Sequence, residues 1–357
     1  MTPREPRHTP ELIMLDVIDV PLMTRILRNV GIERFLRELT DYIAQDFARW
    51  EHFEKSARSA SHSKYGVIEL MPTNDGVTYA CKYVNGHPGN PQHGMLTVTA
   101  FGVLADVASG YPLLISEMTL LTALRTAATS ALAARHLARS NSRTMALIGT
   151  GAQAEFQALA FKSVNNVRRI RYFDTDAGAM RKFQRNLEGV EGLELIAARS
   201  IADCIIDADI ITTATAAKAR ASILTPDLIR CGVHINGIGG DCPGKTEIHP
   251  AVVRSARVVV EFLPQSRVEG EIQVLGPDFD AIELWRIVKG ETAGRRTSEE
   301  VTLFDSVGFA IEDFSALRYV RDLLRSHSID ARVPLLPHVT DPKDLYSLIG
   351  EPQRHAT

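Results

Sequence analysis

The chain has 357 residues, of which 45% are hydrophobic and 23% are charged, and its formal net charge is -3. These values are typical of a globular protein with room for two domains. The slightly acidic balance argues against a surface that coats nucleic acid, which requires clustered basic residues. Because no apolar run reaches the roughly 18 to 20 residues that span a bilayer, we expect a cytoplasmic chain without membrane contact.

The ends of the chain and its cysteines give little sign of export. Residues 1–10 are rich in proline, arginine and histidine, which predicts a mobile tail rather than a secretory signal. The four cysteines form no Cys-x-x-Cys pair, and buried free thiols are expected at all of them: Cys81, Cys204, Cys231 and Cys242. No cluster has metal-ligand spacing, so no metal site is expected.

The first part of the chain predicts a small α+β unit. Apolar side chains recur at spacings of three and four over residues 12–50, which indicates two helices. Short β-type runs follow, with at least one hairpin, at residues 67–70, 78–84, 96–104 and 111–115. The segment 118–138 is rich in alanine and leucine and predicts a long connecting helix.

From residue 144 onward, strand-like and helical segments alternate regularly. The predicted strands are residues 145–148, 169–173, 193–197, 210–213, 233–236 and 258–260. Repeated units of this length predict an α/β fold with a Rossmann-type, doubly wound parallel sheet. A later helix, residues 309–324, is expected to return to the first unit. We therefore predict an α+β domain of residues 11–130 with 309–357, and a Rossmann domain of residues 131–308.

A glycine turn, Gly149-Thr150-Gly151-Ala152-Gln153-Ala154, follows the first of these strands and opens a helix. Gly149 permits the tight turn, and Gly151 lets a diphosphate approach the backbone amides at the helix N-terminus. Asp174 ends the next strand about 25 residues later, where a carboxylate can bind ribose hydroxyls and repel a 2′-phosphate. This context predicts NAD rather than NADP, although Arg171 and Arg181 lie nearby; a turn without a nucleotide is the alternative.

A second loop, Gly239-Gly240-Asp241-Cys242-Pro243-Gly244-Lys245-Thr246, matches the phosphate loop Gly-x4-Gly-Lys-Thr. A P-loop nucleotide hydrolase is therefore an alternative, but Asp241 would place a carboxylate in the phosphate cradle. Pro250 also falls where the helix after such a loop should run. The preferred interpretation puts Asp241 at the carboxyl end of a parallel strand as a general acid/base, tuned by burial and by Lys245. An ordinary turn residue is the other possibility for Asp241.

Four charged residues lie in or near apolar segments of the first unit: Arg58, Glu69, Lys82 and Arg125. Lys82 is the most informative, because it interrupts a strand pattern and lysine is seldom buried without a function. Arg58 can bind a carboxylate through two parallel hydrogen bonds. The alternatives are a solvated, outward Lys82 and an exposed surface Arg58.

The segments around these residues resemble the ornithine cyclodeaminase/μ-crystallin family, above all its bacterial ornithine cyclodeaminases. The resemblance covers about residues 17–348, and its matching segments are 55–58, 66–72, 82–88, 123–130, 151–153, 239–247 and 305–310. It implies that the α+β domain binds substrate and forms a homodimer. It also implies a cyclodeaminating ammonia lyase, which converts L-ornithine to L-proline and ammonia by hydride transfer to and from bound NAD.

The resemblance assigns roles to individual residues. Asp241 matches the catalytic acid/base, and the positions that match substrate contacts are Arg58, Glu69, Lys82, Asp241 and Val307. With Gly149 and Gly151 from the turn, the positions that match NAD contacts are Thr97, Arg125, Ala152, Gln153, Asp174, Thr215, Ile238, Gly239, Gly240, Asp241, Lys245 and Ser306. Relatives of the same fold act on lysine, cyclic ketimines or other amino acids. A non-catalytic binding protein and a simple amino-acid dehydrogenase are further alternatives.

Overall fold

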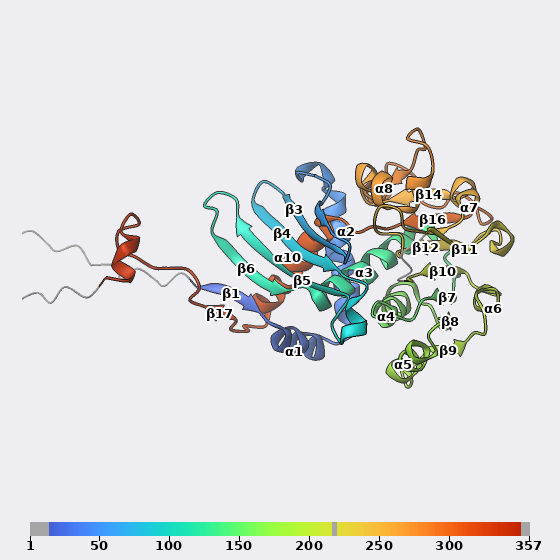
Figure 1. Cartoon of the computed structure of the whole chain (residues 1–357), viewed down its shortest axis with the longest axis horizontal. Helices are drawn as coiled ribbons and strands as arrows, with labels where there is room; N and C mark the ends of the chain where they lie inside the picture. Colours follow the sequence, from blue (N-terminus) through green and yellow to red (C-terminus); the bar gives the residue numbers. More distant parts are fainter. Residues whose placement is uncertain (1–13, 216–219, 351–357) are drawn as a thin grey trace, which may run out of the picture.

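A computed structural model of the chain describes residues 14–215 and 220–350. Two large sheets lie side by side in it, and the helix α3 (Thr119–Leu137) runs between them (Figure 1). The predicted N-terminal tail lies outside the described residues. Among the described residues, no helix is long and apolar enough to cross a membrane.

The first sheet has seven strands in the order β17-β1-β6-β5-β4-β3-β2. Its strands are β1 (Leu15–Ile18), β2 (Ser59–His62), β3 (Val67–Asn74), β4 (Thr78–Gly86), β5 (Val98–Asp106), β6 (Pro112–Glu117) and β17 (Arg332–Val333). All neighbours are antiparallel except β1 and β6. The four predicted strands are present, whereas β1, β2 and β17 were not predicted. These three have only two to four residues each, too few for a periodic signal.

Helices cover one face of this sheet. They are α1 (Val20–Val30), α2 (Ile32–Ala48) and α10 (Ala310–Ser326), and α10 packs directly on β3, β4 and β5 (Figure 1). Strand alternation explains the packing: Ala80, Lys82 and Val84 of β4 are buried beneath the helices, while the residues between them are only half-buried. The late helix therefore lies on the first sheet, although it is more than 200 positions further along the chain than β4.

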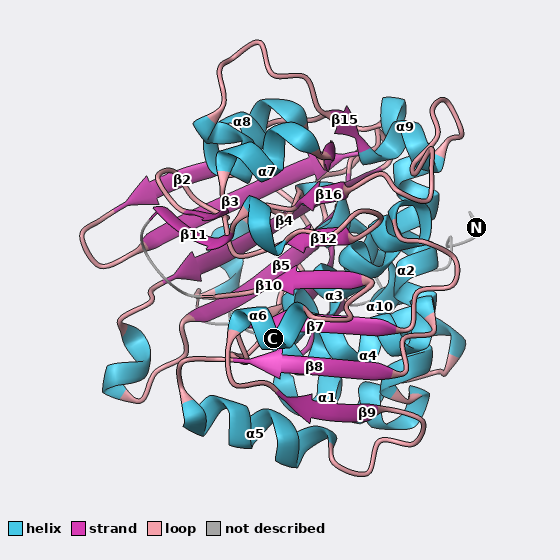
Figure 2. Cartoon of the chain, turned by 90° about the vertical axis from the view of Figure 1, so that its right-hand side faces the viewer, coloured by secondary structure: helices cyan, strands magenta, loops and turns pink. Residues whose placement is uncertain are grey.

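The second sheet has eight strands, all parallel, in the order β15-β14-β16-β12-β10-β7-β8-β9 (Figure 2). Its strands are β7 (Thr144–Ile148), β8 (Arg169–Phe173), β9 (Glu194–Ala197), β10 (Ile210–Thr213), β12 (His234–Gly237), β14 (Arg257–Val260), β15 (Ile282–Glu283) and β16 (Thr302–Asp305). Its helices are α4 (Ala154–Asn165), α5 (Ala177–Leu187), α6 (Ile201–Ile205), α7 (Pro250–Ser255), α8 (Leu263–Glu269) and α9 (Leu284–Val288). This confirms the predicted Rossmann-type sheet.

The chain order reverses direction across the sheet between β7 and β10. From β7 the chain adds β8 and β9 on one side and then returns to add β10 and β12 on the other. Ligands of open parallel sheets bind beyond the carboxyl ends of the strands at such a switch point. The topology therefore directs the search for a site to the loops that follow β7 and its neighbours.

Shorter elements complete the chain. The strands β11 (Arg220–Leu224) and β13 (Thr246–Ile248) form a small parallel pair, and single 3-10 turns occur at η1 (Trp50–His52), η2 (Asn90–His93), η3 (Pro226–Leu228), η4 (Glu271–Val274) and η5 (Leu345–Leu348). The cysteines are free thiols. The expectation that they are all buried is wrong: Cys204 in α6 is buried, Cys81 and Cys242 are half-buried, and Cys231 is exposed in the turn before β12.

Candidate active site

Most residues predicted to contact a dinucleotide lie along one edge of the second sheet. They follow the carboxyl ends of five neighbouring strands, β16, β12, β10, β7 and β8, in that order: Ser306, Ile238 to Asp241, Thr215, Gly149 to Gln153, and Asp174. Parallel strands bring these five loops to the same edge. Residues spread over more than 150 positions of sequence are thereby collected into one continuous row.

The glycine turn after β7 combines one crowded and one open position. Gly149 has φ +98°, and a Cβ there would lie 2.5 Å from the carbonyl oxygen of Ala214, at the end of β10. A Cβ on Gly151 would meet nothing within 4 Å. Gly151 and Ala152 are exposed just before α4 begins. The turn thus packs tightly on the sheet and presents open backbone at a helix N-terminus, as anion binding requires.

Asp174 is tied directly to this turn. Its Oδ2 accepts hydrogen bonds from the backbone amide of Thr150 at 2.6 Å and from the Thr150 hydroxyl at 3.1 Å, and its Oδ1 accepts one from the amide of Asp176. Thr150 is fully buried. Thr150 thus holds the carboxylate beside the place where an adenosine ribose is expected.

The loop from Gly239 to Lys245 does not have the architecture of a P-loop. Lys245 is followed by the strand β13 rather than by a helix, and Pro250 begins the separate helix α7. A P-loop needs a helix directly after its lysine, so that the helix N-terminus faces the phosphates. The structure therefore argues against the nucleotide hydrolase.

Glu247 packs against the start of this loop and against the loop that follows β10. Its Oε1 accepts hydrogen bonds from the Thr215 hydroxyl and, at 2.9 Å, from the Thr215 amide. A Cβ on Gly239 would lie 2.1 Å from Oε2 of Glu247. Burial raises the pKa of Glu247. The glutamate braces two of the loops at the sheet edge against each other.

Asp241 lies on the open side of the same loop. Its Oδ1 is 3.1 Å from Nζ of Lys245, which agrees with the expected neighbour, and the pKa of Lys245 is raised by this carboxylate although burial opposes it. The side chain of Asp241 is 53% exposed, however. The expectation that burial tunes Asp241 is therefore wrong, because the loop projects beyond the end of β12 rather than into the core.

Arg58, directly before β2, lies in a first cluster of buried charges. Its side chain is only 7% exposed, so the alternative of a surface arginine is wrong. NH1 lies 3.0 Å from Oε2 of Glu69 and Nε lies 3.1 Å from Oε2 of Glu269. NH2 donates to the carbonyl oxygens of Val307 at 2.5 Å and Gly308 at 2.9 Å. Arg58 thus joins the first sheet to the loop that follows β16.

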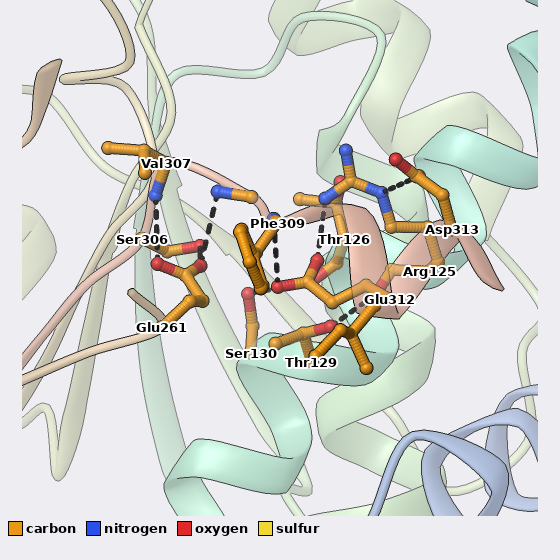
Figure 3. A network of polar contacts seen from close by, with 12 residues as sticks. Arg125, Thr126, Thr129, Ser130, Glu261, Ser306, Val307, Phe309, Glu312 and Asp313 are labelled. Carbon is orange, nitrogen blue, oxygen red and sulfur yellow. Dashed lines mark hydrogen bonds and ion pairs between the residues drawn. The ribbon is translucent and has the colours of Figure 1, made fainter. Parts of the chain in front are cut away.

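Lys82 and Arg125 lie in a second cluster (Figure 3 draws the Arg125 part). Nζ of Lys82 is 2.8 Å from the carboxylate of Asp313, and Nε of Arg125 is 3.0 Å from the same carboxylate. NH1 of Arg125 is 2.7 Å from Oε2 of Glu312. Lys82 is 1% exposed, so it does not face solvent. Asp313 therefore holds two cations, one from β4 and one from α3, at the start of α10.

The electrostatics of this second cluster follow from its burial. Burial and, to a smaller extent, the nearby charge of Arg125 lower the pKa of Lys82 to about 8, although Asp313 opposes both effects. Burial raises the pKa of Glu312 to about 8, and Arg125 opposes that rise. The buried charges of this cluster are thus stabilised by pairing with one another.

The segment from Ser306 to Gly308 is fixed by a further buried acid. Glu261 accepts hydrogen bonds from the Ser306 hydroxyl at 2.5 Å and from the amides of Val307 and Gly308 at 3.2 Å (Figure 3). Burial raises the pKa of Glu261. Since these amides point to Glu261, the carbonyls of Val307 and Gly308 are free to accept from Arg58.

Gln153, at the end of the glycine turn, contacts a neighbouring helix, whereas Thr97 lies away from the strand-end loops. Gln153 donates from Nε2 to the carbonyl of Ala123 at 2.9 Å, which connects the glycine turn to α3, the helix that carries Arg125. Thr97 lies just before β5, where its carbonyl accepts from the amide of His87. The hydrogen bonds of the described residues do not join Thr97 to the other site residues.

Sequence reasoning missed most of the buried acids of the site. Those that contact the predicted cations or fix their neighbours are Glu261, Glu269, Glu312 and Asp313. A usable signal was present, because Glu312 and Asp313 stand between the apolar residues Ile311 and Phe314. This is the same interruption of an apolar pattern that drew attention to Lys82.

The fold and this arrangement define a class of protein: a Rossmann-type sheet with a glycine turn at its switch point, beside a second sheet that contributes buried charges. The family model for the ornithine cyclodeaminase/mu-crystallin family matches residues 21–328. The chain belongs to this family.

Individual relatives match over nearly the full length. The chain is 54% identical to the ornithine cyclodeaminase of Brucella suis biovar 1 over 340 residues, which is 95% of each protein. Among solved structures, a lysine cyclodeaminase described with L-lysine, L-ornithine and L-2,4-diaminobutyric acid has a TM-score of 0.87 at 30% identity, covering 94% of this chain and 100% of the other. An archaeal alanine dehydrogenase dimer with bound NAD has a TM-score of 0.81 at 27% identity, covering 91% and 100%.

Proposed function

We propose that this chain is an NAD-dependent ornithine cyclodeaminase, which converts L-ornithine to L-proline and ammonia. The similarity to ornithine cyclodeaminases over 95% of both proteins supports this reaction. The observation that carries the proposal is the contact of Arg58 with Val307 and Gly308. This contact places a buried cation, which could bind an amino-acid carboxylate, against the loop that follows β16. That loop lies beside the edge of the sheet where the dinucleotide is predicted to bind, so that substrate and cofactor would lie close together.

The residues at the sheet edge suit NAD. Gly151 and Ala152 leave exposed backbone at the N-terminus of α4 for the pyrophosphate, and Asp174 lies at the end of β8 for the ribose hydroxyls. The carboxylate of Asp174 also disfavours the 2′-phosphate of NADP. When bound, NAD would take a hydride from Cα of the substrate and return it to the cyclic imine.

The side chains would divide the remaining work. Arg58 and Lys82 would hold the substrate carboxylate, and Asp241 would accept a proton from an amine of the substrate. Once Cα has become an imine carbon, the distal amine of the same molecule attacks it. A five-membered ring forms readily because both reacting groups belong to one held chain. Ammonia then leaves from Cα.

The test is to incubate the purified protein with L-ornithine and a trace of NAD while following ammonia, proline and NADH absorbance. Proline and ammonia in equal amounts, far above the NAD supplied and without lasting NADH, are the expected result. NADH that accumulates in step with substrate loss would instead identify a simple dehydrogenase.

The main alternative within the family is a different diamino acid. The solved lysine cyclodeaminase, described with three diamino acids, favours including L-lysine as a second substrate in the same assay. One methylene is worth only about 1 to 3 kcal/mol in a pocket. We therefore expect a preference between ornithine and lysine rather than absolute exclusion.

A homodimer in the cytoplasm completes the proposal. The face of the first sheet opposite α10 exposes large apolar side chains, among them Ile68, Leu70 and Phe101, and Tyr83 stacks on Phe101 at 5.1 Å. Such a face is typical of a subunit interface, and the archaeal relative is a dimer. Sedimentation of the wild type and of Phe101→Lys tests this: we expect a dimer that the substitution dissociates. The free cysteines suit a reducing compartment.

A further inference from the structure

We propose that Glu269 is a second proton acceptor of the active site, which binds the ammonium group of the diamino acid that Asp241 does not take. This inference rests on the proposed function. Glu269 is the last residue of α8, and its carboxylate lies beside Arg58. It would distinguish substrates with two amines from substrates with one.

The geometry of Glu269 is that of a carboxylate without a complete set of partners. The residue is 6% exposed, and its Oε2 lies 3.1 Å from Nε of Arg58. Neither of these two atoms makes a hydrogen bond, and both are buried. Oε2 is therefore held near Arg58 by charge alone. A buried carboxylate oxygen in this situation gains from a donor that points directly at it.

The charged groups around Glu269 include more carboxylates than cations to pair with them. Arg58 already faces Glu69 through NH1 and two carbonyl oxygens through NH2. Burial raises the pKa of Glu269 to about 7; Arg58 opposes the rise, and Glu69 and Asp241 add to it. Burial and the charge of Asp241 raise the pKa of the Cys242 thiol, and Glu269 adds a smaller contribution.

The other nearby cations are already paired. Within the described part of the chain, Lys82 faces Asp313, and Arg125 faces both Asp313 and Glu312. Lys245 faces Asp241. A further positive charge for the cluster around Arg58 would thus come from a bound molecule. A primary ammonium group has three donors and suits this place.

The proposed reaction needs two proton acceptors. Ornithine enters with two ammonium groups, and Cα can lose a hydride only when its amine is neutral. The distal nitrogen can attack only when it is neutral too. Two protons must therefore leave before the ring closes, and we assign one to Asp241 and one to Glu269. No other group in the two clusters combines a position at Arg58 with an unpartnered carboxylate oxygen.

The two protons and the hydride that leave ornithine are all returned when the products form. Attack of the distal amine on the iminium carbon forms the ring C–N bond, one proton moves from the ring nitrogen to the departing nitrogen, and the old C–N bond breaks to release ammonia. The returned hydride gives proline with a neutral ring nitrogen. One stored proton then converts ammonia to ammonium, and the other converts the ring nitrogen to its cationic form.

The test is Glu269→Gln, assayed with two substrates. The first is L-ornithine; the second is Δ1-pyrroline-2-carboxylate with NADH, which has a carboxylate but no second amine and needs no proton removed. We expect kcat/KM for ornithine to fall by about 100-fold, with a smaller change, about threefold or less, for the imine. For the wild type, kcat/KM for ornithine should rise with pH through about 7, as Glu269 ionises. This limb should be absent from Glu269→Gln and present in Glu269→Asp.

Several outcomes would overturn the inference. An equal loss with both substrates would mean that Glu269 only positions Arg58, and an unchanged rate with ornithine would mean that it has no part in proton transfer. Arg267→Gln, an exposed change in the same helix, is the matched control and should behave as the wild type. NADH affinity and thermal unfolding establish that each variant is folded. A wild type that makes no proline would refute the proposed function itself.

Discussion

The two sheets contribute to the site in different ways. The second sheet offers mainly backbone: a glycine turn, strand ends and a helix N-terminus in one row. The first sheet offers buried side-chain charges whose partners are far away in sequence, such as Lys82 with Asp313, 231 positions apart. A backbone site tolerates most side-chain changes except at its glycines. A charge cluster fails when a single partner is lost, because a buried unpaired charge is costly.

We expect the largest effect on activity from substitution of Asp241. Asp241→Asn keeps the shape of the loop after β12 but removes the proposed proton acceptor. We expect kcat for L-ornithine to fall by about 100-fold or more, since general acid/base groups contribute that much. NADH affinity, measured by fluorescence titration, should change little. Full activity would remove Asp241 from the mechanism, and loss of NADH binding would make it a cofactor contact instead.

The backbone site can be tested by a matched pair of substitutions. Gly149→Ala puts a Cβ into a left-handed conformation, 2.5 Å from the Ala214 carbonyl oxygen. It should lower the free energy of unfolding by about 2 to 4 kcal/mol. Gly151→Ala meets no atom within 4 Å, so it should leave stability within about 0.5 kcal/mol of the wild type.

The second member of the pair isolates binding from folding. Gly151→Ala should weaken NADH binding by about tenfold, because its methyl group occupies the approach of the pyrophosphate. Denaturant unfolding and NADH titration measure the two effects separately. Unchanged NADH affinity in Gly151→Ala would place the pyrophosphate elsewhere.

The charge cluster predicts a smaller, pH-dependent effect. Asp313 raises the pKa of Lys82, so Asp313→Asn should move that pKa below its present value of about 8. A lysine is charged below its pKa, and the variant therefore loses this charge at a lower pH than the wild type does. The KM for Δ1-pyrroline-2-carboxylate should rise by about tenfold at pH 8 and less at pH 6, as Lys82 stops binding the carboxylate.

Glu312→Gln is the control for this prediction. Glu312 contacts Arg125 but not Lys82, and an arginine does not titrate in this range. Replacing Glu312 removes its own ionisation near pH 8 but leaves Lys82 paired with Asp313, so KM should rise less at pH 8 than it does in Asp313→Asn. If Asp313→Asn also kept the wild-type pH dependence, Lys82 would not be a carboxylate-binding group.

The contrast between the sheets also explains what could be predicted. The parallel sheet and its glycine turn follow from local patterns of a few residues, and both are present as expected. Lys82 and Arg125 are buried, as charges inside apolar segments can be recognised in a sequence. Arg58 is buried too, although nothing in the polar segment around it favours burial. Their acidic partners could not be assigned, since pairing across such sequence distances depends on how α10 docks on the first sheet.

Local context misled in other places. Asp241 was expected to be buried because it follows a buried strand, but its loop carries it beyond the sheet edge. Strands β1 and β17 are too short to give a periodic signal; β1 pairs with the edge of β6, and β17 in turn pairs with β1. Both cases show that exposure and edge pairing are properties of the assembled sheet and not of the segment.

The hydrogen bonds between Thr150 and Asp174 have a consequence for coenzyme engineering. A designer who wished to admit NADP would first replace the aspartate to relieve repulsion of the extra phosphate. That replacement would also strip the buried threonine of its acceptor and loosen the glycine turn. Coenzyme preference and turn rigidity are thus encoded in one pair of residues, and a successful redesign would have to change both together.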